Sequence, residues 1–186
     1  MNSSKLACLR PLAFLALAGL LVGCAPVAAP SGAEDPTPEQ RLEELGVTLS
    51  EPAAPVANYV RAVTTGNLVF LAGHIPRDAG GVVTGKLGSD LTWEEGYDAA
   101  RLSAIALLSS LKAEIGELDR VTRIVRVTGM VNSAPDFTDQ SKVVNGASDF
   151  LVEVFGERAK HARAAVGMAS LPLGAAVEVQ MVVEIG

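Results

Sequence analysis

The sequence has few of the residues that build metal or redox sites. It contains 2 cysteines and 2 histidines among 186 residues. Both cysteines, Cys8 and Cys24, lie near the N-terminus, so the rest of the chain has no thiol for a disulfide, a catalytic thiolate or a thiolate metal site. The two histidines, His74 and His161, are too few for a histidine-built metal centre. We therefore expect neither a metal nor a cofactor.

Basic residues are also in the minority. Lys and Arg together number 15 against 21 Asp and Glu, which gives a formal net charge of −6 at pH 7. A positively charged surface supplies most of the affinity of proteins for nucleic-acid phosphates, and this chain has no such excess of charge. We expect no RNA or DNA partner.

The chain has no apolar segment at its N-terminus that is long enough to cross a membrane. Lys5 and Arg10 precede the uncharged segment 11–23, whereas a bilayer of roughly 30 Å needs about 20 apolar residues. Residues 1–23 therefore predict a cleaved export signal. The segment ends in Leu21-Val22-Gly23-Cys24, which resembles a lipobox, so we predict that Cys24 is acylated. Plain secretion, with a cut near Ala25, is the alternative.

A lipidated N-terminus predicts an exported protein that is anchored to a membrane, in the periplasm or on the cell surface, because each buried CH₂ of an acyl chain contributes about 0.8 kcal/mol. Ala25 after the cysteine, rather than Asp, favours the outer membrane. Residues 24–40 are rich in Ala, Pro, Ser and Gly and predict a flexible tether. Residues 41–186 have the length and pattern of one domain.

Hydrophobic patterns within the domain predict strands and helices in a β-β-α-β-α-β-β order. The run 68–72 is continuously apolar, as in a strand buried on both faces. The expected elements are a short helix or turn at 41–46, strands at 56–63 and 68–72 around a turn at Gly66-Asn67, a helix from the capping box Thr92–Glu95, a strand at 121–131, a helix from Pro135-Asp136 to Gly156, and strands at 163–168 and 177–185.

This order predicts an α+β fold in which a mixed sheet carries two helices on one face. The helical positions Ala104, Leu108, Leu111 and Ile115 have the spacing of a core-facing stripe. The second face of the sheet would expose a large apolar patch unless something covered it. Self-association is the simplest way to cover it.

Arg163 and Glu178 are polar residues in the two C-terminal strands. If residues 171–174 turn the chain back, these strands can pair and bring the two side chains together. The guanidinium would then be a forked donor for a ligand carboxylate, and the glutamate could transfer protons to or from water. A structural salt bridge at the sheet end is the alternative interpretation.

The same residues carry a resemblance to the Rid (YjgF) family. The segment 59–76, with Gly66-Asn67 and Ala72-Gly73-His74-Ile75-Pro76, is similar to the family's N-terminal pattern. The spacing of Arg163, Leu171-Pro172 and Glu178 matches its C-terminal signature, and Asn145 falls at the family's asparagine on the second helix. The resemblance covers residues 47–186.

The resemblance implies a chorismate-mutase-like fold, a homotrimer, and clefts between subunits. It further implies hydrolysis of reactive enamines and imines to 2-oxo acids and ammonia without a cofactor. In that interpretation Arg163 holds the substrate carboxylate and Glu178 assists water, and the residues that line the cleft are Tyr59, Gly73, His74 and Asn145. The expected partners are a small carboxylate-bearing molecule, further copies of the chain, and a membrane through the lipid anchor only.

Three positions depart from the family pattern. Ala72 stands where a small hydroxyl residue is common, His74 replaces the usual glutamine, and Ala165 replaces a frequent cysteine. His74 could restore a hydrogen bond or carry a proton, or it could be a satisfied polar residue at a strand end. These changes leave open a non-catalytic protein that binds small carboxylates, or a scaffold of the cell envelope.

Overall fold

The computed structural model describes residues 35–52 and 57–186, so the predicted signal and Cys24 lie outside the described residues. The described part from Asp35 onward forms one compact unit. Its main elements are α1 (Pro38–Glu44), β1 (Ala62–Thr65), β2 (Leu68–His74), the short pair β3 (Arg77–Asp78) and β4 (Gly81–Val82), α2 (Trp93–Ile115), β5 (Val121–Asn132), α3 (Gln140–Phe155), β6 (Ala162–Met168) and β7 (Val177–Ile185). Three short 3₁₀ helices, η1 (Leu118–Arg120), η2 (Gly156–Ala159) and η3 (Pro172–Gly174), join them.

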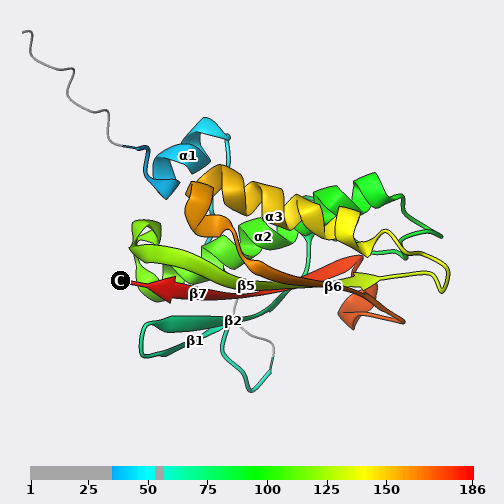
Figure 1. Ribbon diagram of the computed structural model, residues 1–186. Coiled ribbons are helices and arrows are strands. Elements are labelled where there is room, and N and C mark those ends of the chain that lie inside the picture. The colour runs from blue at the N-terminus through cyan, green and yellow to red at the C-terminus, as the bar shows by residue number, and fades with distance from the viewer. Residues whose placement is uncertain (1–34, 53–56) are drawn as a thin grey trace, which may run out of the picture. The chain divides into compact units, whose positions relative to one another are not determined.

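The sheet has five strands in the order β1-β2-β7-β5-β6. Only the β5–β6 pair is parallel, with α3 as its crossover connection, and the other pairs are antiparallel. Figure 1 shows α2 and α3 side by side on one face of this sheet. The predicted fold class, a mixed sheet with two helices on one face, is therefore confirmed.

α2 begins and α3 ends where the sequence provides caps, but α3 begins at Gln140 rather than after Pro135-Asp136, and Asp139 before it makes no capping hydrogen bond. Thr92 and Glu95 form the predicted capping box of α2, with each side chain accepting a hydrogen bond from the other residue's backbone N–H. Gly156 has a φ of 59° and ends α3. The predicted apolar stripes of both helices are buried against the sheet, together with the inward residues of β7.

Two predictions about the first strands are wrong. The strand expected at 56–63 is β1 at 62–65, because residues 57–61 form bends and irregular backbone. The run 68–72 is buried on one face only, since Phe70 on its other face is 44% exposed. The physical reason is that both long helices cover the same side of the sheet.

The helix α1 begins at Pro38, within the segment that the composition assigned to the tether. Thr37 and Gln40 form a second capping box at its start. Glu39 fixes α1 to the domain because its carboxylate accepts hydrogen bonds from Lys112 Nζ at 3.1 Å and from the backbone N–H of Leu118 at 2.8 Å. These local contacts were not visible in a segment rich in proline and alanine.

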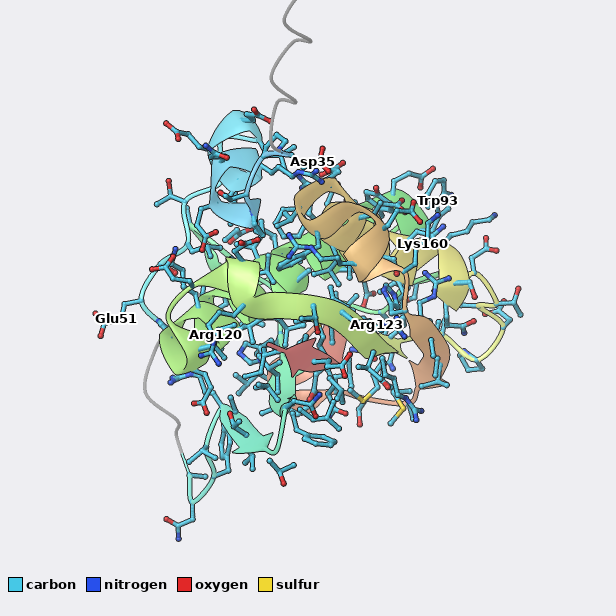
Figure 2. All side chains as sticks on the ribbon, turned by 60° about the vertical axis from the view of Figure 1, so that its left-hand side comes forward. Asp35, Glu51, Trp93, Arg120, Arg123 and Lys160 are labelled. Carbon is cyan, nitrogen blue, oxygen red and sulfur yellow. The ribbon has the colours of Figure 1, made fainter. Side chains whose placement is uncertain are left out.

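The face of the sheet away from the helices carries exposed apolar side chains. Val63, Phe70 and Val182 lie opposite one another across β1, β2 and β7, and Val166 on β6 lies on the same face. Val63 is 52% exposed and Val166 is 43% exposed. Figure 2 shows side chains projecting from the sheet on this side. We call this surface, formed by Val63, Phe70, Val166, Val182 and Met130, the open face.

Candidate functional site

Arg163 lies on the edge strand β6, beneath α3. Its Nη1 donates to Asn145 Oδ1 at 2.8 Å and to Ser148 Oγ at 3.0 Å. Asn145 and Ser148 are three residues apart on α3, so both side chains point to the same side of the helix. The two bonds fix one edge of the guanidinium plane.

The other edge of the guanidinium is available to a ligand. Within residues 35–52 and 57–186, neither Nε nor Nη2 of Arg163 makes a hydrogen bond, and the residue is exposed. These two nitrogens present parallel N–H groups, which is the geometry that binds a carboxylate bidentately. Asn145 and Ser148 thus orient an arginine whose free donors face solvent.

Glu178 lies on β7, and its side chain occupies the space over Gly73 on β2. A Cβ atom built on Gly73 would lie 1.7 Å from Glu178 Oε1. Burial raises the pKa of the Glu178 carboxyl above its ordinary value. Among the described residues no donor forms a hydrogen bond with this carboxylate, so both oxygens remain able to accept a proton or a water.

The structure does not bring Arg163 and Glu178 together. Arg163 is paired with Val127 on β5, and Glu178 is paired with Met130 on the same strand. Because side chains alternate along a strand, Val127 and Met130 point to opposite faces. Val127 is buried under the helices. Arg163 therefore lies on the helix-covered face and Glu178 on the open face.

The expected pairing of the two C-terminal strands is consequently wrong. Residues 171–174 do not form a hairpin, because β6 runs parallel to β5 and β7 returns on the other side of β5. With β5 between them, β6 and β7 share no hydrogen bonds. The described side chains also form no salt bridge between Arg163 and Glu178, so the structural alternative finds no support within one chain.

His74 is held within the fold rather than directed toward Glu178. Its Nδ1 lies 2.9 Å from the carbonyl of Ala72, and its Nε2 lies 2.7 Å from Ser110 Oγ on α2. Burial lowers the pKa of His74, so the ring is neutral at pH 7. Tyr59, by contrast, precedes β1 with half of its surface exposed. A ligand role for either residue stays a prediction.

Ser148 and His161 were not among the predicted site residues. Ser148 Oγ lies 3.1 Å from His161 Nε2, next to its contact with Arg163. A signal for both residues was present. His161 precedes Arg163 by two positions, and Ser148 follows Asn145 by about one helical turn. Residues at these spacings lie on the same face of a strand or a helix.

A separate hollow of about 420 Å³ lies beside α1 and is lined by Thr37, Glu39, Glu117, Asp119 and Arg120. Its main charges already have partners. Glu39 binds Lys112, Asp119 binds Arg158, and Arg120 binds the carbonyl of Gly186. None of the predicted site residues lines it, so we place the candidate site at Arg163 and Glu178 instead.

The described ranges contain neither a metal-ligand cluster nor a membrane-spanning helix. No cluster of three or more His, Cys, Asp or Glu side chains that could hold a metal occurs in them. None of the helices in these ranges is long and apolar enough to cross a membrane.

The fold defines a class: α+β proteins with a chorismate-mutase-like sheet and helix layer. Residues 39–185 match the family described as "YjgF/chorismate_mutase-like, putative endoribonuclease". The chain belongs to this YjgF (Rid) family.

Relatives of known sequence or structure support this membership. Protein TCP17 of Trypanosoma cruzi is 50% identical over 146 residues, which cover 77% of this chain and 91% of that protein. Protein Atu1372 from Agrobacterium tumefaciens, of unknown function, is 43% identical over 80% of this chain and 92% of its own, with a TM-score of 0.75. A structure from Shewanella oneidensis, described as "a putative endoribonuclease", is 35% identical over 81% of this chain and all of its own, with a TM-score of 0.78.

Proposed function

We propose that this protein hydrolyses reactive 2-imino acids, and the enamines from which they form, to 2-oxo acids and ammonia. The observation that carries the proposal is the free Nε/Nη2 edge of Arg163, which fits the carboxylate that every such substrate has. An imine carbon is already electrophilic, so holding the substrate in place and moving protons supply most of what the reaction needs. Family membership supports the same assignment.

The proposed site is shared between subunits of a homotrimer. One chain has Arg163 and Glu178 on opposite faces of its sheet, so a small ligand can meet both only when two chains come together. The open face of one subunit would contribute Glu178 and Gly73, and the β6–α3 edge of its neighbour would contribute Arg163 and Asn145. Exposed apolar side chains on the open face support an assembly that covers it.

Glu178 acts in this proposal as the group that exchanges protons with water. Its raised pKa places the carboxyl closer to the working pH than an ordinary glutamate. A neighbouring subunit that covers the open face would remove more solvent from the carboxyl and raise its pKa further.

The test uses the chain from Ala25 onward, which contains the whole folded unit. An amino-acid oxidase generates 2-imino acids, and release of 2-oxo acid is measured against trapping of the imine by semicarbazide. We expect acceleration by the wild type and at least a 10-fold loss with Arg163→Ala, because a hydrogen bond to a charged group contributes about 1.5–3 kcal/mol. Lys160→Ala, an exposed cation in the same segment (Figure 2), is the matched control and should act like the wild type. Absence of acceleration by correctly folded wild type would contradict the proposal.

A protein that binds small carboxylates without chemistry is the second candidate. The location of Arg163 and Glu178 on opposite faces of the sheet within one chain favours this candidate. Ala72 and Ala165 also favour it, because they remove polar groups from the expected cleft. Glu178→Gln separates the two candidates. If the protein is an enzyme, Glu178→Gln loses turnover and keeps its affinity for a 2-oxo acid. If it only binds carboxylates, the wild type already shows no turnover. We do not propose endoribonuclease activity, because the acidic chain lacks the excess of positive charge that binds the phosphates of RNA.

Export and lipidation at Cys24 form a further part of the proposal, supported by the sequence around residues 21–24. Expression of the full chain in a bacterium with labelled palmitate tests it. We expect the label in the wild-type protein and in the membrane fraction, and neither with Cys24→Ala. An unlabelled, soluble wild-type protein in the exported fraction would show plain secretion instead.

A further inference from the structure

Ser148 connects Arg163 to His161 through two hydrogen bonds. Its hydroxyl oxygen lies 3.0 Å from Arg163 Nη1 and 3.1 Å from His161 Nε2. Arg163 has only donors, so the oxygen of Ser148 accepts from it. The serine proton is then free to point toward the imidazole.

The tautomer of His161 follows from its second contact. Its Nδ1 lies 2.6 Å from the carbonyl oxygen of Ala159, which can only accept, so Nδ1 carries the proton. Nε2 of the neutral ring is therefore an acceptor and receives the hydroxyl of Ser148. The result is a serine hydroxyl that donates to a histidine and lies next to the proposed carboxylate anchor.

Other serines on the helices show that this arrangement is not the default. Ser103 and Ser109 on α2 donate to the carbonyls of Ala99 and Ile105, four residues earlier, as helical serines often do. Ser110 instead bonds to His74 Nε2, with Nδ1 of that ring on the carbonyl of Ala72. That second pair has the same geometry, but its histidine belongs to the predicted cleft and it does not contact Arg163.

The charges around His161 favour its neutral form. Burial lowers the pKa of His161, and the positive charge of Arg163 lowers it further, although the bond to Ala159 opposes them. Among the described side chains nearby, Lys160 pairs with Glu157, Arg158 pairs with Asp119, and Asp149 is bonded to Tyr97. At pH 7 the ring is therefore neutral, with its proton on Nδ1, and Nε2 can take up a second proton.

We propose that Ser148 and His161 form a proton relay for the substrate that Arg163 holds. This inference rests on the proposed imine hydrolysis and adds two residues of the Arg163-bearing subunit to its mechanism. Ser148 contacts the reacting water, and His161 acts through Ser148 as the group that stores the proton.

The relay carries the proton of the addition step, and Glu178 remains available for the second proton transfer. As water oxygen bonds to the imine carbon, Ser148 takes a proton from the water and passes its own proton to His161 Nε2. The electron pair of the C=N bond moves to nitrogen, which receives the stored proton back through Ser148 and gives a carbinolamine. Transfer of the remaining hydroxyl proton to nitrogen then forms the C=O bond, breaks the C–N bond and releases ammonia. Ser148 and His161 end in their starting states.

The test compares His161→Gln and Ser148→Ala with the wild type in the imine assay. Glutamine can still accept the hydrogen bond from Ser148, so folding should be preserved. It cannot store a proton, so the relay should be lost. For His161→Gln we expect a fall in kcat of about 100-fold, the lower range for loss of a proton-transfer group, with KM nearly unchanged. For Ser148→Ala we expect a similar fall in kcat together with a higher KM, because this change also removes a hydrogen bond that orients Arg163. Ser109→Ala, which removes an ordinary helical serine bond to the Ile105 carbonyl, should leave kcat and KM at the wild-type values.

The pH profile gives a readout that a structural role would not change. The relay works only while His161 is neutral, and its pKa lies below the ordinary 6.5, so the wild-type rate should fall as the pH drops below 6.5. His161→Gln should remove this loss of rate at low pH. Any dependence on pH that remains in the variant would come from other groups, such as the Glu178 carboxyl.

The outcomes distinguish this inference from the proposed function. If the wild type accelerates hydrolysis and Arg163→Ala abolishes it, but His161→Gln changes neither kcat nor the profile, only the relay is overturned. If the wild type gives no acceleration, both proposals fail together.

Discussion

At the scale of single residues, the absence of a side chain at Gly73 provides the space that Glu178 occupies. Gly73 does not have a positive φ, so glycine is required there for space rather than for its backbone conformation. The atoms that a Cβ would meet belong to the far end of the glutamate, which can rotate away. The fold should therefore tolerate alanine while the carboxylate moves.

Gly73→Ala is expected to displace the Glu178 carboxylate and to lower imine hydrolysis to about the level of Glu178→Gln. Its melting temperature should stay close to the wild-type value, because a flexible side chain gives way. Turnover and thermal unfolding measured on the same preparation check both parts. Full activity in a folded Gly73→Ala protein would show that the position of Glu178 over Gly73 is not needed.

At the scale of elements, α2 and α3 approach closely at Gly146. A Cβ on Gly146 would lie 1.9 Å from the backbone carbonyl oxygen of Tyr97 on α2. A carbonyl within a helix cannot rotate away, so the two helices would have to separate. Asn145 and Ser148 flank this contact on α3, so the approach of the helices also determines how the Arg163 anchor is held.

Gly146→Ala is expected to lower the free energy of unfolding. Overpacking costs about 1–3 kcal/mol, and the gain in helix propensity of about 1 kcal/mol offsets only part of it. Gly96→Ala is the matched control on α2, because its new methyl would meet the side-chain carbons of Leu87 and Val143. Urea denaturation should show a larger loss for Gly146→Ala, and an equal or larger loss for Gly96→Ala would contradict this explanation.

At the scale of the whole molecule, the two-layer design leaves one sheet face without a helical cover. A sheet with both long helices on one side exposes the apolar residues of the other side to solvent unless chains associate. The same association would unite Arg163 of one chain with Glu178 of another. Oligomeric state and activity should therefore be lost together.

Phe70→Glu places a charge on the open face and is expected to convert the proposed trimers to monomers and to abolish imine hydrolysis. Leu45→Glu, at the end of α1, is a control of similar exposure away from the sheet, and should keep the wild-type mass and activity. Sedimentation velocity gives the masses. An active monomer would contradict a site that is shared between subunits.

Local patterns in the sequence were sufficient for the fold class and for most elements, but not for the bounds of β1 or the start of α1. The capping box at Thr92, the stripes of α2 and α3, and the alternation of β7 depend on residues a few positions apart, so they can be recognised without the fold. Arg163, Asn145 and Glu178 could be selected by their types and spacing. What these residues contact was not determined by spacing.

Only the tertiary structure decided which groups meet. Strand order inserted β5 between β6 and β7 and separated Arg163 from Glu178, because pairing of distant strands depends on the crossover through α3 rather than on the loop at 171–174. The packing of α3 over β6 joined Ser148 and His161 to the arginine, and the packing of α2 enclosed His74. The sequence by itself determined the two long helices, β7 and the layers, since those follow from local periodicity and residue chemistry. The faces, the neighbours and the tautomers depended on contacts between residues far apart in the chain.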